Sequence, residues 1–335
     1  MHAAHGDVRL SLPPHAAGVS RGAVALRSHG LGIFGAHRSR APPVPCGGAG
    51  RGRGVCDSLV GMRSHSIEVN GLHFRVVEDG SGPAVLLLHG FPDSSYLWRN
   101  QVPALVAAGY RAIAPDLRGF GESDKPEAVE AYALPLLLSD VTGILDTLGV
   151  DRAHVIAHDW GAALGWLLAG MYPDRIERFV ALSVGHMSAF AAAGIEQREK
   201  SWYMLLFQFR GIAEEALRRN EWRLFRQWAR DHAEVEHWIS TLSRPGALTA
   251  GLNWYRANVA PETLLADPAP FPSVKVPTLG VWSSGDAYLT EEQMVRSREH
   301  VTGAWQYERI EGASHWMQLD QPEQLNRLLT HFLAA

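Results

Sequence analysis

The chain has 335 residues, of which 46% are apolar and 20% are charged. This composition is ordinary for a globular protein, and the length suits one large α/β domain with an insertion, or two domains. The net charge of −4 gives no electrostatic reason to expect nucleic acid or an anionic membrane surface as a partner. No apolar run approaches the roughly 20 residues that a membrane-spanning helix needs.

Residues 1–61 differ in composition from the rest of the chain. They contain seven Arg, no Lys and two acidic residues, with no sustained hydrophobic period. We expect them to lie outside the fold, as a targeting-like peptide, a flexible tail, or translated sequence upstream of a start at Met62. Both cysteines, Cys46 and Cys56, lie in this tail, and their spacing predicts no metal site. The remainder therefore fits a reducing compartment, and we expect a cytoplasmic protein unless the tail directs import into an organelle.

Strand and helix patterns alternate from residue 62 onward. Two alternating segments around Asn70 and Gly71 predict a hairpin over residues 66–77. Continuous apolar runs, typical of buried parallel strands, follow at 84–88, 111–114, 154–157, 179–182 and 278–282, with a mixed strand at 306–310. Helical spacing of apolar residues predicts helices over 97–106, 134–148 and 322–333. This order predicts an α/β fold with a mostly parallel sheet and helices on both faces.

The alternation stops between residues 186 and 271. This stretch has a helical pattern, is rich in aromatic residues and separates two predicted core strands. We interpret it as a helical cap inserted between a first core part, residues 62–185, and a second core part, residues 272–335. Ligands of open α/β sheets bind beyond the carboxyl ends of the strands, where we expect this cap to lie.

The sequence AHDWG at residues 157–161 stands between a predicted strand and a predicted helix. In that place, a nucleophile two residues before a Gly forms the nucleophile elbow of α/β-hydrolases. The nucleophile position holds Asp159 instead of Ser. A carboxylate does not usefully attack the carbonyl of an ester or an amide. It can, however, displace a leaving group from a saturated carbon and form an ester. Asp159 therefore predicts the opening of an epoxide or the displacement of a halide.

Turnover of such an ester needs a general base, for which His315 is the best placed residue. It lies between the last predicted strand and the last predicted helix. Asp286, just after the strand at 278–282, is the expected acid that orients the imidazole. The order Asp159, Asp286, His315 along the chain matches the order of nucleophile, acid and base in the superfamily.

Hydrolysis of the ester places negative charge on the former carboxylate of the nucleophile. We expect the backbone N–H groups of Phe91 and Trp160 to receive it as an oxyanion hole. Phe91 belongs to HGFP at residues 89–92, directly after the strand at 84–88. There Gly90 permits a close approach of the backbone, and Pro92 can fix the turn through a cis bond.

Residues 65–333 resemble the epoxide hydrolases of the α/β-hydrolase superfamily, of the type with an Asp nucleophile. The resemblance is carried by HGFP at 89–92, DLRGFG at 116–121, HDWG at 158–161 and GASH at 312–315. Such enzymes use two cap tyrosines to protonate the epoxide oxygen. Segments 202–208 and 252–256 resemble the two cap segments that carry these tyrosines in the family. The resemblance therefore implies that Tyr203 and Tyr255 are the proton donors.

The resemblance implies hydrolysis of an epoxide to a vicinal diol through an ester on the nucleophile. Water, activated by the His and its acid, would then resolve the ester, without any metal or organic cofactor. The expected partners are a small apolar epoxide and water, because the proposed pocket is apolar. Its expected substrate-binding residues are Phe91, Pro92, Trp160 and Met204.

Haloalkane dehalogenases share the HDWG elbow and stay as the alternative function. They commonly bind the departing halide with an Asn at the position that Phe91 occupies here. Fluoroacetate dehalogenases usually carry Arg after the nucleophile, where this chain has Trp160. A binding protein of the same fold without activity is a third interpretation, weakened because every catalytic position is filled. The natural epoxide, the enantio- and regioselectivity and the oligomeric state stay open.

Overall fold

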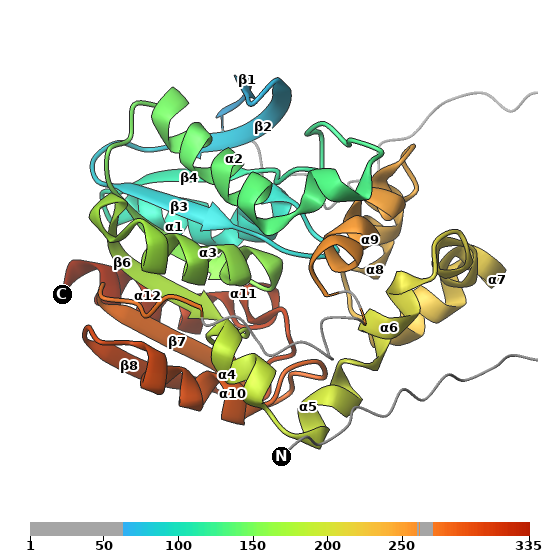
Figure 1. The fold of residues 1–335 in the computed structure, drawn as a ribbon. Coiled ribbons are helices and arrows are strands. Elements are labelled where there is room, and N and C mark those ends of the chain that lie inside the picture. The colour runs from blue at the N-terminus through green and yellow to red at the C-terminus, as the bar shows by residue number, and fades with distance from the viewer. Residues whose placement is uncertain (1–62, 260, 262–270) are drawn as a thin grey trace, which may run out of the picture. The chain divides into compact units, whose positions relative to one another are not determined.

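The structure, a computed structural model, describes residues 63–259, 261 and 271–335. The predicted tail, with Cys46 and Cys56, lies outside the described residues. The described part contains an eight-stranded sheet in the order β1-β2-β4-β3-β5-β6-β7-β8 (Figure 1). Its strands are β1 Arg63–Val69, β2 Leu72–Asp79, β3 Ala84–Leu88, β4 Arg111–Pro115, β5 Ala153–His158, β6 Ile176–Leu182, β7 Thr278–Ser283 and β8 Trp305–Ile310.

The predicted hairpin and parallel strands form one continuous sheet. β1 and β2 are antiparallel and β2 is antiparallel to β4, whereas all pairs from β4 to β8 are parallel. Asn70 and Gly71 turn the hairpin with φ values of 54° and 74°, the backbone that a two-residue hairpin turn requires. Every residue of β3, β5 and β7 is buried, as continuous apolar runs predict. The predicted mostly parallel sheet is confirmed.

Helices cover both faces of the sheet. α2 and α3 contact each other on the face toward the viewer in Figure 1, and α1 and α12 contact each other on the opposite face. The helices and 3₁₀ turns of the core are η1 Ser95–Asn100, α1 Gln101–Ala107, η2 Val129–Tyr132, α2 Leu134–Thr147, α3 Trp160–Met171, η3 Pro173–Arg175, α10 Glu291–Arg296, η5 Ser297–His300, α11 Met317–Asp320 and α12 Pro322–Ala334.

The helix predicted over residues 97–106 is divided into η1 and α1. A proline has no N–H, and its ring clashes with the carbonyl four residues earlier in an α-helix. Pro103 therefore cannot extend one α-helix back through Arg99, and the chain forms a tighter 3₁₀ turn before Gln101. The side chain of Ser94 begins this turn by accepting a hydrogen bond from the backbone N–H of Tyr96.

The aromatic-rich stretch between β6 and β7 is helical in its described residues. Figure 1 places its helices α6, α8 and α9 beyond the carboxyl ends of the central strands. α7 is kinked where Asn220, Glu221 and Trp222 have positive φ values. The predicted cap boundary at residue 271 adjoins residues 262–270, which are not described, so the division into cap and core stays a prediction. The helices of the stretch between β6 and β7 are α4 Met187–Ala192, α5 Ile195–Lys200, α6 Trp202–Gln208, α7 Ile212–Trp228, α8 Val235–Leu242 and α9 Ala247–Asn258.

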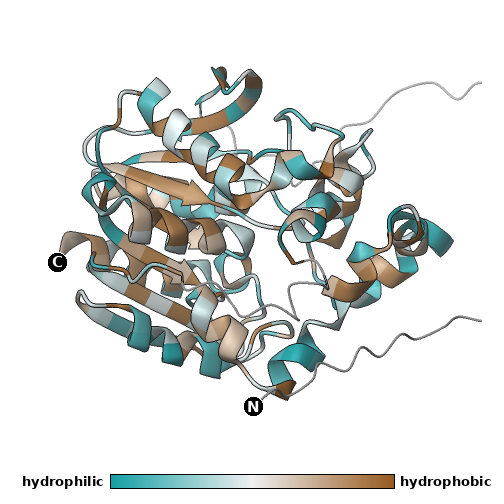
Figure 2. Ribbon diagram, viewed as in Figure 1, coloured by the Kyte–Doolittle hydropathy of each residue, from teal (hydrophilic) through white to brown (hydrophobic). Residues whose placement is uncertain are grey.

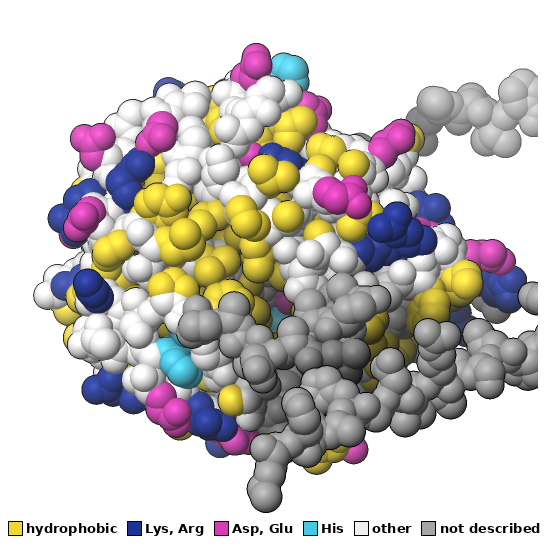
Figure 3. All heavy atoms as spheres, viewed as in Figure 1, with side chains coloured by type: hydrophobic (Ala, Val, Ile, Leu, Met, Phe, Trp, Pro, Cys, Tyr) yellow, Lys and Arg dark blue, Asp and Glu magenta, His cyan; other side chains and the backbone are white. Residues whose placement is uncertain are grey.

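Apolar residues concentrate in the strands and on the helix faces turned toward them (Figure 2). The large buried cluster continues from the sheet into the inserted helices through the side chains of Phe91, Tyr203 and Tyr255. On the face shown in Figure 3, acidic and basic side chains are interspersed, so no large field of one sign forms there. Among the described residues, no helix combines the length and apolar character that crossing a membrane requires.

Candidate active site

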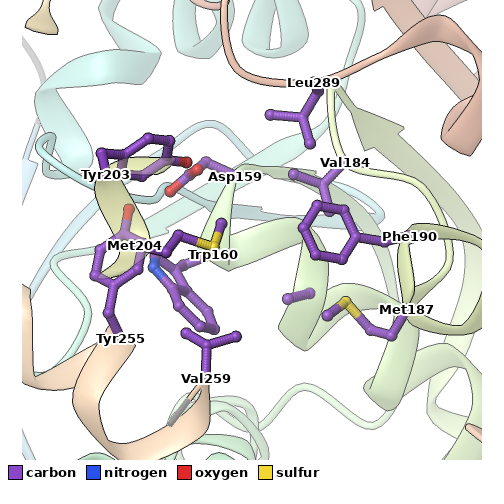
Figure 4. A pocket seen from close by; sticks show the side chains of 11 residues that line it. Asp159, Trp160, Val184, Met187, Phe190, Tyr203, Met204, Tyr255, Val259 and Leu289 are labelled. Carbon is purple, nitrogen blue, oxygen red and sulfur yellow. The ribbon is translucent and has the colours of Figure 1, made fainter. Parts of the chain in front are cut away.

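Asp159 occupies the sharp turn between β5 and α3. Its backbone has φ 52° and ψ −124°, a conformation that residues other than Gly rarely adopt. Gly161 makes the turn feasible, because a Cβ atom there would overlap the carbonyl oxygen of Leu88 on the adjacent strand. This strained turn at the carboxyl edge of the sheet is the geometry of a nucleophile elbow. It presents the Asp159 carboxylate to a cavity (Figure 4).

The structure brings Asp159, His315 and Asp286 together from three separate loops. Nδ1 of His315 lies 2.8 Å from Oδ2 of Asp286, and Nε2 lies 3.6 Å from Oδ2 of Asp159. The other oxygen of Asp286 accepts the backbone N–H groups of Tyr288 and Leu289 at 2.8 and 2.9 Å. This carboxylate is therefore held from both sides and fixes the orientation of the imidazole.

The three groups set one another's ionisation. Burial opposes the charged form of His315, but the adjacent carboxylates of Asp286 and Asp159 outweigh burial and raise its pKa to about 10. Burial likewise opposes the charged carboxylates, yet the pKa of Asp159 and that of Asp286 are lowered, chiefly by His315. At neutral pH the site thus holds an imidazolium between two carboxylates.

Backbone N–H groups on both sides of the elbow point at the Asp159 carboxylate. The N–H of Phe91 donates to Oδ1 of Asp159 at 2.8 Å, and the N–H of Trp160 also stabilises the carboxylate. Gly90 is required here, because a Cβ atom at this position would overlap the Asp159 carboxylate. The bond between Phe91 and Pro92 is cis. The two predicted oxyanion donors therefore converge on one carboxylate.

Tyr203 from α6 and Tyr255 from α9 face Asp159 from the inserted helices, as Figure 4 shows. Their ring centroids lie 6.0 Å apart, and both side chains are buried. Burial is the main cause that raises the pKa of each phenol well above its ordinary value, and the nearby charge of Asp159 adds to it. Both phenols are therefore neutral O–H donors across the accessible pH range.

The cavity in front of Asp159 contains about 430 Å³ of empty space, part of it open to solvent. Apart from the carboxylate, its walls are almost entirely apolar or aromatic, which suits an apolar ligand. The residues that line it are Asp159, Trp160, Ala163, Val184, Met187, Phe190, Tyr203, Met204, Tyr255, Val259 and Leu289.

Two of the predicted substrate-binding residues, Trp160 and Met204, line this cavity, whereas Phe91 and Pro92 do not. The ring of Phe91 is buried among other aromatic rings, including Phe207 at 5.7 Å and Tyr255 at 5.8 Å between centroids. Its backbone N–H faces the carboxylate while its side chain faces the hydrophobic core.

The sequence analysis missed the wall formed by Val184, Met187 and Phe190. These residues follow β6, at the sheet edge where ligands bind, so their position after a core strand was an available signal. His89 has a structural role: Nε2 accepts the backbone N–H of Leu117 at 2.9 Å. Within the described ranges, no three His, Cys, Asp or Glu side chains form a group that could hold a metal ion.

Comparisons with known proteins agree with this architecture. The family model described as the alpha/beta hydrolase fold matches residues 83–322. Epoxide hydrolase A of Mycobacterium tuberculosis is 33% identical in a match 313 residues long, and the match covers 80% of this chain and 96% of that protein. The chain therefore belongs to the α/β-hydrolase fold family.

Among solved structures, epoxide hydrolases are also similar to this chain. The crystal structure of epoxide hydrolase A from Mycobacterium thermoresistibile has a TM-score of 0.68 and 31% identity, covering 82% of this chain and 98% of that one. An epoxide hydrolase of Bacillus megaterium, crystallised with an inhibitor, has a TM-score of 0.74 and 27% identity, covering 81% and 100% of the two chains. The resemblance to epoxide hydrolases that the sequence predicts is confirmed.

Proposed function

We propose that this protein hydrolyses a small apolar epoxide to a vicinal diol through an ester on Asp159. The observation that carries the proposal is the placement of two buried phenols, Tyr203 and Tyr255, opposite the Asp159 carboxylate in one apolar cavity. The names of the similar proteins support the same activity. A carboxylate facing two neutral O–H donors suits a reaction in which the nucleophile attacks carbon while the leaving oxygen needs a proton.

The first step forms the ester. The lowered pKa of Asp159 keeps its carboxylate charged, so an oxygen of this residue can attack an epoxide carbon. The ring C–O bond breaks, and its electron pair passes to the epoxide oxygen. That oxygen takes a proton from Tyr203 or Tyr255, whose hydroxyls would also polarise the ring beforehand. The product of this step is a β-hydroxyalkyl ester of Asp159.

Ester formation converts His315 from a counterion into a base. The negative charge of Asp159 disappears in the ester, which removes one of the two carboxylates that raise the pKa of His315. The imidazolium then releases its proton, which restores the phenol that gave one up. Asp286 keeps the neutral ring oriented through Nδ1, with Nε2 directed toward the ester.

The second step hydrolyses the ester. His315 takes a proton from water as the water oxygen attacks the ester carbonyl carbon of Asp159. The backbone N–H groups of Phe91 and Trp160 stabilise the oxyanion that forms. Collapse of this intermediate expels the substrate oxygen, which takes the proton of the new carboxyl group. The diol leaves, and the carboxylate and the imidazolium are regenerated.

We propose that residues 186–271 act as a cap that completes the site, because both phenols come from its helices. The alternative, a haloalkane dehalogenase, is less favoured by the cavity. A departing halide needs no proton, so the two phenols would have no chemical role, and the side chain of Phe91 provides no donor for the halide. The apolar walls indicate a substrate with hydrocarbon substituents.

The test is turnover of styrene oxide by the purified protein, with 1-bromobutane as the competing substrate. We expect 1-phenylethane-1,2-diol from the first compound and no bromide from the second. Asp159→Ala protein serves as the control and should form no diol above the uncatalysed rate. Release of bromide without formation of a diol would identify a dehalogenase instead.

A further inference from the structure

A second cavity lies on the other side of an aromatic wall from the catalytic cavity. It contains about 580 Å³ of empty space, part of it open to solvent. It is formed by the junction of α5 and α6, the second half of α7 and the loop after β7. The residues that line it are Lys200, Trp202, Leu224, Gln227, Trp228, Arg230, Ala287 and Tyr288.

The charged residues of this cavity are two cations, Lys200 and Arg230, and no carboxylate side chain lines it. In the part of the chain that the structure describes, neither cation lies in an ion pair with an acidic residue. The Lys200 ammonium donates to the backbone carbonyl of Asp286 at 3.0 Å, which leaves two of its three hydrogens for another acceptor. A guanidinium such as that of Arg230 can bind a carboxylate through two parallel hydrogen bonds.

The remaining walls favour a flat apolar group. Trp202 is 50% exposed, although large apolar side chains are usually buried, and it lines the cavity together with Trp228 and Tyr288. Leu224 adds an aliphatic surface. Aromatic walls of this kind bury the ring of a ligand by stacking or edge-to-face contact. Cations beside aromatic walls, with no acid among them, fit an amphipathic anion.

The second cavity is separate from the catalytic one, because the two share no lining residue. The partition consists of Trp228 and Tyr288, whose ring centroids are each 5.6 Å from that of Tyr203. The hydroxyl of Tyr288 donates to the backbone carbonyl of Trp228, which ties the two sides of the partition together. A ligand can therefore occupy the second cavity without entering the first.

We propose that this cavity is a binding site for an arylcarboxylate. The carboxylate would lie between Lys200 and Arg230, and the aromatic ring would pack against Trp202 and Trp228. The catalytic cavity is a poor site for the same anion, because the charged carboxylate of Asp159 faces it. The site goes beyond epoxide hydrolysis and does not depend on that activity.

The test is equilibrium dialysis of radiolabelled 1-naphthoate against the full chain at low salt. We expect one saturable site, with affinity at least roughly tenfold greater than that for the neutral 1-naphthalenemethanol. Lys200→Met/Arg230→Met protein should lose at least roughly tenfold in affinity. Arg198→Met, which removes an exposed cation of the same helix α5, should bind like the wild type.

Two further variants keep the test decisive. Lys200 contacts the backbone of Asp286, so the double variant could be poorly folded. Arg230→Met alone alters an exposed side chain and should still weaken binding several-fold while thermal unfolding stays unchanged. Asp159→Ala should leave the affinity unaltered, whereas an anion bound in the catalytic cavity would bind more tightly once that charge is removed. Unchanged binding in both Arg230 variants, or tighter binding in Asp159→Ala, would overturn the proposal.

Discussion

Nε2 of His315 lies 3.6 Å from Oδ2 of Asp159. At this distance the imidazolium and the carboxylate attract each other in the free enzyme. The same Nε2 is within reach of a water molecule beside the carbonyl carbon of an Asp159 ester. The same geometry therefore serves two successive states of the site. Before the epoxide reacts, His315 and Asp159 form a charged pair, and afterwards His315 is a base for the water that attacks the ester.

Replacement of His315 by Gln should separate the two chemical steps. The nucleophile and both phenols stay in place, so we expect the epoxide to form the ester while hydrolysis slows by roughly 10²–10⁴-fold. Intact-protein mass spectrometry should then find the enzyme heavier by one epoxide molecule. Absence of this adduct, despite consumption of epoxide by the variant, would argue against a covalent intermediate.

Asp286→Asn should weaken His315 as a general base without removing its imidazole. An amide carries no charge, so the variant loses the Coulombic attraction of Asp286 that raises the pKa of His315. We expect the pKa of this imidazole to fall, as followed by nitrogen NMR of labelled protein, and kcat to fall by roughly 10²–10⁴-fold. An unchanged pKa in the folded variant would show that the contact between the two side chains does not control the base.

The two phenols should be partly redundant. Both face Asp159 from the same side of the cavity, so Tyr203→Phe or Tyr255→Phe alone leaves one O–H donor. We expect each single change to lower kcat/KM less than the double change, which should cost roughly 10²–10⁴-fold. Rates of ester formation in single-turnover experiments would measure this directly. Full activity of the double variant would remove the phenols from the mechanism.

The Asp93 carboxylate should make the free energy of unfolding depend on pH. Its carboxylate is buried between the core and the inserted helices, where the indole N–H of Trp238 donates to it at 2.9 Å. Burial is the main cause that raises its pKa from 3.8 to about 7. The folded state therefore binds more protons than the unfolded state between these values. This contribution to stability is complete below pH 3.8 and is lost as the pH rises through about 7.

Asp93→Asn removes this titration. We expect the difference between its free energy of unfolding and that of the wild type, from urea titrations between pH 4 and 8, to change by up to about 1.4 kcal/mol per pH unit. Asp174→Asn, which neutralises an exposed carboxylate of η3, is the matched control and should follow the pH dependence of the wild type. The same pH dependence in both variants would show that Asp93 ionises like a surface carboxylate.

The parallel strands and the positions of Asp159, Asp286 and His315 could be predicted because each of these residues follows a strand. Asp159 and Asp286 follow buried strands, and His315 follows the partly exposed edge strand β8. Parallel strands end at one edge of the sheet, so loops far apart in sequence meet there. Other features depend on how the inserted helices pack on the core. The packing of the Phe91 ring against Phe207, and the contact of Asp93 with Trp238, join segments whose approach no local pattern encodes.

The central claim is that the Asp159 carboxylate bonds to the substrate and is regenerated by water. A single turnover of styrene oxide in water enriched in oxygen-18, with enzyme in excess, tests it most directly. We predict that mass spectrometry will find the heavy oxygen in the side chain of Asp159 and that the diol from this first turnover will be unlabelled. Heavy oxygen in the diol with none in Asp159 would show that water attacks the epoxide directly, contradicting the account.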